Sequence, residues 1–225
     1  MSRAAVTLLF AALASAAWWK AFGNAAKAVD EATLAAWTSA LYAVLRAAIV
    51  AAFTVLVAVR PPSRRRSRDP LAFAICAAAI LAVVTLEAPA PGAAPARVLL
   101  GEALAVCACG WLLASTVALG RCFGVLPEVR GLIVSGPYRL VRHPVYLGEL
   151  GACAGLVLAS PTPRNLAAGA VFGVAQGIRI RLEERALGHE FAEYLAYAAR
   201  TPMLLPRMPV SFGPDPVSSA RRERR

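Results

Sequence analysis

The feature that most constrains this chain is a series of long apolar blocks, each near the length needed to cross a bilayer. A hydrocarbon core roughly 30 Å thick requires about 20 apolar helical residues. Six such spans are expected, at residues 4–22, 34–59, 71–86, 98–119, 145–159 and 166–180. Because the blocks mostly lack the polar stripe of a soluble amphipathic helix, the sequence predicts an all-α, polytopic transmembrane bundle of about 5–6 helices.

The composition supports this interpretation over a soluble helical protein with an alanine-rich core. Hydrophobic residues make up 59% of the chain and charged residues only 16%, whereas soluble domains usually carry about 25% charged residues. The first block also has features of a secretory signal, because Arg3 precedes it. Trp18, Trp19 and Lys20 at its end instead favour a retained helix with an interfacial aromatic belt.

The net charge of +11 is concentrated beside the apolar blocks. Five arginines lie in the connection 60–69 and four more end the chain, namely Arg60, Arg64, Arg65, Arg66, Arg68, Arg221, Arg222, Arg224 and Arg225. No aromatic residues interleave with them, so a nucleic-acid surface is not expected. Lysine and arginine favour cytoplasmic loops, and anionic membrane lipids are their expected partners. This places the segment 120–142 and the tail after residue 181 together on the cytoplasmic side of an inner or plasma membrane.

Three regions are predicted along the chain. Residues 1–96 form N-terminal transmembrane helices with a possible link to substrate, residues 97–206 form a core that carries the chemical motifs, and residues 207–225 form a basic, disordered tail. The two histidines, His143 and His189, are well separated, and four of the five cysteines lie in apolar blocks. No metal site is therefore expected.

The first informative motif lies in the connection before the fifth span. Gly136-Pro137 is a turn signal, and Pro144 suits the first position of a helix because its missing N–H costs nothing there. The fifth span should therefore begin at His143-Pro144, with Tyr146 in its first turn. The free N–H groups of a helix N-terminus bind anions, including carboxylates.

The second motif follows the sixth span, where Arg179 and Glu183 are four residues apart and share a helix face. A purely structural interpretation remains open, in which Arg179 is a membrane-boundary arginine paired with Glu183. Together the two motifs place a carboxylate, guanidinium groups, an imidazole and two phenols at one membrane surface. That combination suits a zwitterionic cofactor bearing an aromatic ring.

At these residues the chain resembles the isoprenylcysteine carboxyl methyltransferases and the related bacterial and phospholipid methyltransferases. The resemblance covers roughly residues 120–206. It rests on Gly136-Pro-Tyr138, Arg142-His-Pro-Val-Tyr146, Arg179-Ile-Arg-Leu-Glu183-Glu184, Glu193-Tyr194 and Arg200-Thr-Pro202.

The resemblance implies S-adenosyl-L-methionine as the cofactor. The residues implied to line it are Arg130, Gly131, Leu132, Ile133, Tyr138, His143, Pro144, Val145 and Tyr146, with Glu183 holding a polar group. Arg179 matches the substrate-side arginine of the family. A polar contact found in some members falls near Phe123, whose side chain cannot reproduce it.

The acceptor implied by the resemblance is lipid-like or amphipathic, and its reactive group could be a carboxylate, an amine or a thiol. A carboxylate would need no base, whereas an amine or thiol must lose a proton, for which His143 is the candidate. An NADPH-dependent membrane reductase of sterol-reductase-like architecture is the alternative enzyme. A non-catalytic membrane protein or transporter is the third hypothesis.

One further expectation concerns Arg46, which lies well inside the second span. A charged side chain at membrane depth usually faces protein and finds a partner. Glu102 is the carboxylate at comparable depth, so the two residues are expected to pair between helices.

Overall fold

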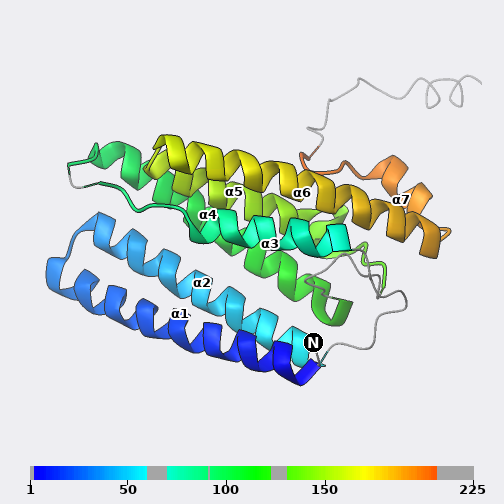
Figure 1. Ribbon diagram of the computed structural model, residues 1–225, viewed down its shortest axis with the longest axis horizontal. Coiled ribbons are helices and arrows are strands. Elements are labelled where there is room, and N and C mark those ends of the chain that lie inside the picture. Colours follow the sequence, from blue (N-terminus) through cyan, green and yellow to red (C-terminus); the bar gives the residue numbers. More distant parts are fainter. Residues whose placement is uncertain (1–2, 60–69, 91, 123–130, 207–225) are drawn as a thin grey trace, which may run out of the picture.

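The computed structural model describes residues 3–59, 70–90, 92–122 and 131–206, and these residues are helical with no strand among them (Figure 1). The elements are α1 (Arg3–Glu31), α2 (Leu34–Val59), α3 (Pro70–Val84), α4 (Pro95–Leu119), η1 (Gly120–Cys122), η2 (Gly136–Arg139), α5 (Pro144–Ala159), α6 (Pro163–Glu190) and α7 (Tyr194–Arg200). The predicted all-α class is confirmed. The arginine-rich connection 60–69, Arg130 and the predicted tail 207–225 lie outside the described residues.

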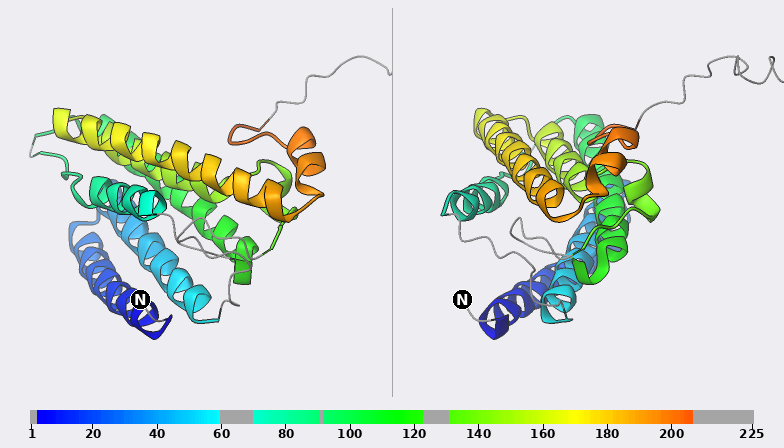
Figure 2. Two further views of the ribbon diagram at one scale, coloured as in Figure 1. Left: turned by 45° about the vertical axis from the view of Figure 1, so that its right-hand side comes forward. Right: turned by 90° about the vertical axis from the view of Figure 1, so that its right-hand side faces the viewer.

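The order of the helices in space differs from their order in the chain. α1 packs on α2, α2 on α4, α4 on α5 and α5 on α6, while α3 packs on the other flank of α6. Figure 2 shows that α3 stands apart from the α1–α2 pair rather than continuing it. The helices therefore surround a central space on several sides, with α3 and α6 facing α1 and α2.

Small residues form the closest helix contact, between α4 and α5. A side chain at Gly101 would lie 2.5 Å from the Gly155 carbonyl oxygen, and one at Gly155 would lie 2.6 Å from the Ala105 nitrogen. Large apolar side chains instead point outward, as with Trp19 on α1 and Leu100 on α4, which are 82% and 61% exposed. Close contact through glycine with bulky residues outside is the arrangement expected of helices packed in lipid.

Two described helices, α2 and α4, are long and apolar enough to cross a membrane. α3 and α5 are apolar but shorter, with 15 and 16 residues. At 1.5 Å per residue they reach only about 22–24 Å, less than the roughly 30 Å of a hydrocarbon core. Helices apolar enough to associate with a membrane are present, whereas the predicted number of spans remains a prediction.

The expected pairing of Arg46 with Glu102 is wrong. Glu102 accepts a hydrogen bond from the Thr38 hydroxyl at 2.8 Å, near the start of α2. Arg46 lies two turns further along α2, where its guanidinium carbon is 5.6 Å from the centre of the Tyr42 ring. Glu102 therefore contacts α2 about two turns nearer the start of that helix than the expected partner, Arg46.

A polar cluster closes the end of the bundle where α6 begins. Asn165 is fully buried; its side chain accepts a hydrogen bond from the Glu87 N–H at 2.9 Å and donates to the Glu87 carbonyl at 3.0 Å. Arg164 forms an ion pair with the Glu87 carboxylate at 2.8 Å, and both side chains are well exposed. These contacts fix the segment after α3 to the start of α6.

Candidate functional site

The connection before α5 folds as its turn residues predict. Gly136 has a φ of 59°, a left-handed conformation that favours glycine, and it is the first residue of the short helix η2. α5 then begins at Pro144, with His143 at the preceding cap position and no side-chain hydrogen bond capping the helix. The predicted start of the fifth helix is therefore confirmed.

Arg142 holds this connection against the C-terminal segment. Its Nε and Nη2 donate to Glu184 Oε1 at 2.9 and 2.7 Å, and its Nη1 donates to the carbonyls of Ala198 and Thr201 at 2.8 and 2.7 Å. The backbone N–H of Arg142 also donates to the Pro202 carbonyl at 2.8 Å. One side chain thus joins the start of α5 to α6 and to the end of α7.

Glu184 accepts two of these hydrogen bonds, and we call the pair the Arg142–Glu184 clamp. Glu184 also contacts His143. The His143 Nε2 lies 3.2 Å from Glu184 Oε1, and the imidazole is almost fully buried. The hydrogen bond with His143, and then the contacts with Arg142, hold the pKa of the Glu184 carboxyl well below its usual range, at about 2, although partial burial acts in the opposite direction. Glu184 is therefore a structural carboxylate rather than a solvated boundary charge.

Two tyrosines, Tyr138 and Tyr197, join η2 to α7. The Tyr197 hydroxyl donates to the Tyr138 carbonyl at 2.6 Å, so α7 contacts η2 directly. Burial raises the pKa of Tyr197 to about 12 and also raises that of Tyr138. Both phenols therefore remain protonated and serve as neutral donors or stacking surfaces.

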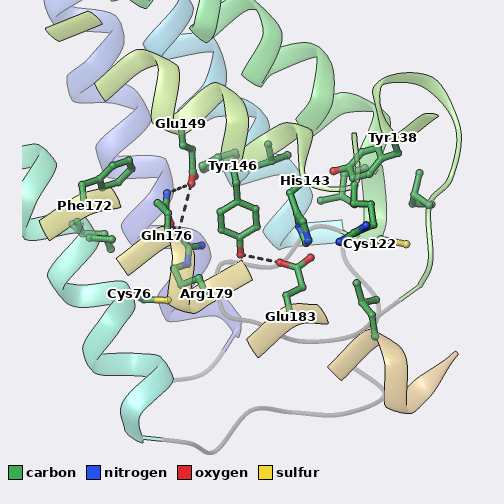
Figure 3. A pocket seen from close by; sticks show the side chains of 18 of the residues that line it. Cys76, Cys122, Tyr138, His143, Tyr146, Glu149, Phe172, Gln176, Arg179 and Glu183 are labelled. Carbon is green, nitrogen blue, oxygen red and sulfur yellow. Dashed lines mark hydrogen bonds and ion pairs between the residues drawn. The ribbon is translucent and has the colours of Figure 1, made fainter. Parts of the chain in front are cut away.

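A cavity of about 440 Å³ lies beside these residues and brings both sequence motifs together (Figure 3). The predicted site residues that line it are Gly131, Leu132, Ile133, Tyr138, His143, Val145, Tyr146, Arg179 and Glu183. Pro144 does not line the cavity; it is fully buried at the first position of α5, where its carbonyl accepts a hydrogen bond from the Trp111 indole at 2.9 Å. Arg130 and Phe123 lie outside the described residues.

The centre of the polar lining is the contact between Tyr146 and Glu183. The Tyr146 hydroxyl donates to Glu183 Oε2 at 2.8 Å, joining the first turn of α5 to α6. The His143 ring meets the Tyr146 ring edge-on, with centroids 5.6 Å apart. Figure 3 shows the imidazole, the phenol and the carboxylate side by side on the cavity wall.

The sequence motifs missed a second polar group, formed by Glu149, Gln176 and Arg179. Gln176 donates to Glu149 and accepts from Arg179 Nη1 at 2.6 Å, while Arg179 Nη1 lies 3.5 Å from Glu149 Oε2. The Arg179 guanidinium also lies over the Tyr146 ring, 5.0 Å from its centre. Two signals were available: Glu149 is a carboxylate within a predicted span, and Gln176, Arg179 and Glu183 share one helix face.

The remaining lining is mainly apolar and comes largely from the N-terminal helices. It includes Phe10 and Leu13 of α1, Val50 and Phe53 of α2, and five residues of α3: Cys76, Ala79, Ile80, Val83 and Val84. A polar wall on α5 and α6 thus shares one cavity with an apolar wall on α1–α3. Such a cavity suits an amphipathic ligand, and its volume lies in the usual range of small-molecule sites.

Comparison with known proteins finds one family model that matches the segment from α4 to α6. The family model described as phospholipid methyltransferase matches residues 94–193, which include α4, α5, all of α6 and both motifs. Residues 94–193 are therefore similar to the phospholipid methyltransferase family, and the resemblance expected from the sequence is confirmed.

Two curated relatives match part of the chain. The cobalt-zinc-cadmium resistance protein CzcN of Cupriavidus metallidurans is 38% identical over 86 residues, covering 36% of this chain and 38% of that protein. The nickel-cobalt-cadmium resistance protein NccN of Alcaligenes xylosoxydans xylosoxydans is 31% identical over 81 residues, covering 34% of this chain and 37% of that protein. The chain thus matches little more than a third of the length of either relative.

Proposed function

We propose that this protein is an integral membrane methyltransferase that uses S-adenosyl-L-methionine and acts on a lipid-like or amphipathic acceptor. The observation that carries the proposal is the single cavity that joins the residues of both family motifs to an apolar wall from α1–α3. A polar wall suits a charged cofactor, and an apolar wall suits the hydrocarbon part of an acceptor.

The residues present fit such a cofactor. Glu183 offers a carboxylate fixed by Tyr146 for an ammonium or hydroxyl group, and Tyr138 and His143 offer ring surfaces. The N-terminus of α5 has no side-chain cap, and Val145 in its first turn lines the cavity. The N–H groups of such a turn would hold a carboxylate.

When bound, S-adenosylmethionine supplies a methyl group on a positively charged sulfur, which is already activated for direct displacement. The task of the chain is then to orient the acceptor and to exclude water. Tyr146 and the Arg142–Glu184 clamp hold the polar wall in place, while α1–α3 supply the apolar wall. For an acceptor that must lose a proton, His143 and Glu149 are the proton-accepting groups on the cavity wall.

The proposal also includes the membrane arrangement. Support comes from the two apolar helices long enough to span, from the outward-facing large apolar side chains and from the family match of residues 94–193. We place the cavity at the cytoplasmic face, because the arginine-rich connection 60–69 and the basic end of the chain should lie there, beside anionic lipids. The names of the two relatives concern metal resistance; since each match covers little more than a third of this chain, no role in metal resistance is carried over to it.

A methyl-transfer screen tests the proposed function. Membranes containing the protein are incubated with methyl-labelled S-adenosylmethionine and with lipid, prenyl-thiol and long-chain amine acceptors. Label should enter an extractable product with the wild type and with Arg164→Ala, a variant remote from the cavity, and should fall strongly with Glu183→Ala. No label above that of empty membranes, together with oxidation of NADPH, would indicate a reductase instead.

A further inference from the structure

Glu149 and Gln176 lie outside the motifs that identified the site, yet they form one polar group with the motif residue Arg179. All three line the cavity, and the side chains of Glu149 and Arg179 are 20% and 13% exposed. Gln176 is fully buried and bridges the other two, accepting from Arg179 and donating to Glu149. Figure 3 shows Glu149 directed toward Gln176 and Arg179 from the facing helix.

This arrangement changes what Arg179 can offer to an acceptor. A guanidinium at the acceptor side would attract a carboxylate, but Arg179 already has the Glu149 carboxylate 3.5 Å away. A second carboxylate at the same guanidinium would lie next to the first, and like charges brought together in a poorly solvated site repel strongly. The other described arginine on the cavity wall, Arg142, is held by Glu184 and two carbonyls.

We infer that Glu149 is a specificity-determining residue that excludes acceptors with a negatively charged reactive end and favours an uncharged or cationic end that donates a hydrogen bond. The inference rests on the proposed function, because it concerns the acceptor of that same cavity. The Glu149 carboxylate accepts the hydrogen bond that the acceptor donates. Gln176 holds Glu149 and Arg179 next to each other through its hydrogen bonds to both.

A purely structural role for the pair makes a different prediction. The ion pair of Arg164 with Glu87 links two segments at the bundle end, and its side chains are 60% and 44% exposed. The Glu149 carboxylate is instead enclosed on the cavity wall, where a ligand would meet it. A structural carboxylate would influence stability but not the preference between ligands of opposite charge.

The test compares two probes of equal chain length, dodecylamine and dodecanoate. Binding is measured by calorimetry with the protein in phosphatidylcholine nanodiscs saturated with S-adenosylhomocysteine. The wild type should bind dodecylamine at least about tenfold more tightly than dodecanoate, the scale of one charge-assisted hydrogen bond. Glu149→Gln, which keeps the shape and removes the charge, should abolish or reverse this preference, whereas Glu102→Gln, a similar change away from the cavity, should preserve it.

A wild-type preference for dodecanoate, or an unchanged preference in Glu149→Gln, would overturn the inference. The wild-type comparison decides by itself if Glu149→Gln does not fold. Binding of S-adenosylhomocysteine in the same samples reports the proposed function independently. Its failure would count against the methyltransferase, whereas normal binding with the wrong probe preference would count against Glu149 alone.

Discussion

The two described arginines on the cavity wall have opposite roles. Arg142 donates all of its described hydrogen bonds to other groups of the protein. It thereby joins the start of α5 to Glu184 and to the carbonyls at the end of α7. Arg179 lies over Tyr146 and pairs with Glu149 and Gln176 on the cavity wall. The two motifs thus contain both residues that assemble the site and residues that face its cavity, and residue type alone does not separate the two kinds.

The largest effect is expected from Arg142→Ala. It removes the guanidinium donor from Glu184 and from two carbonyls in partly buried contacts, and breaking a fully buried ion pair costs about 3–5 kcal/mol, which is the upper bound for this pair. Denaturation in detergent should show this loss of unfolding free energy. Arg164→Ala breaks an exposed pair and should cost at most about 1 kcal/mol. Equal losses in the two variants would mean that Arg142 is not a clamp.

Glu183→Ala should act on binding rather than on folding. The carboxylate faces the cavity and contacts Tyr146, so its loss should weaken S-adenosylhomocysteine binding by about 1.5–3 kcal/mol. Calorimetry measures this change, and the unfolding free energy should change far less than in Arg142→Ala. A destabilised variant with unchanged affinity for S-adenosylhomocysteine would mean that Glu183 stabilises the fold and does not bind the ligand.

A smaller change is expected from Tyr146→Phe, which keeps the ring beside Arg179 and removes only the hydroxyl. The lost hydrogen bond to Glu183 should weaken S-adenosylhomocysteine binding by about 1 kcal/mol, because Glu183 is then less well oriented. The double variant with Glu183→Ala should be no weaker than Glu183→Ala alone. Additive losses would show that Tyr146 acts independently of Glu183.

The smallest effect is expected from lowering the pH, because the Glu184 side chain is only partly buried. Its folded pKa of about 2 lies below the ordinary value of 4.5, so its stabilising contribution is present above pH 4.5 and is lost as the pH falls toward 2. The difference in Tm between the wild type and Glu184→Gln should therefore shrink across this window. A constant difference would mean that the charge of Glu184 does not stabilise the fold.

The sequence predicted most of the fold because apolar block length and proline position are local signals. The starts of α2 and α5 follow from them, as does the turn at Gly136-Pro137. α1 runs past the predicted end at residue 22 to Glu31, and Ala28 in this more polar extension is fully buried. Hydropathy does not detect such a helix extension.

Part of the site could also be predicted from the sequence, because its two motifs are local signals as well. Motif residues such as Tyr146 and Glu183 are close in space because each motif fixes one helix face, and the cavity brings the two faces together. The partners of Arg142, Arg179 and Arg46 depended on how neighbouring helices are offset, which no local pattern encodes. The pairing of Glu149 with Arg179 was therefore missed, and that of Arg46 with Glu102 was expected wrongly.

The most direct test of the central claim is a comparison of S-adenosylhomocysteine with NADPH as ligands of the purified protein. Thermal unfolding in detergent is measured with each compound, because a ligand that binds only the folded state raises Tm. We expect S-adenosylhomocysteine to raise Tm in the wild type and in Arg164→Ala and to raise it much less in Glu183→Ala, whereas NADPH should have no effect. A rise with NADPH and none with S-adenosylhomocysteine would contradict the account.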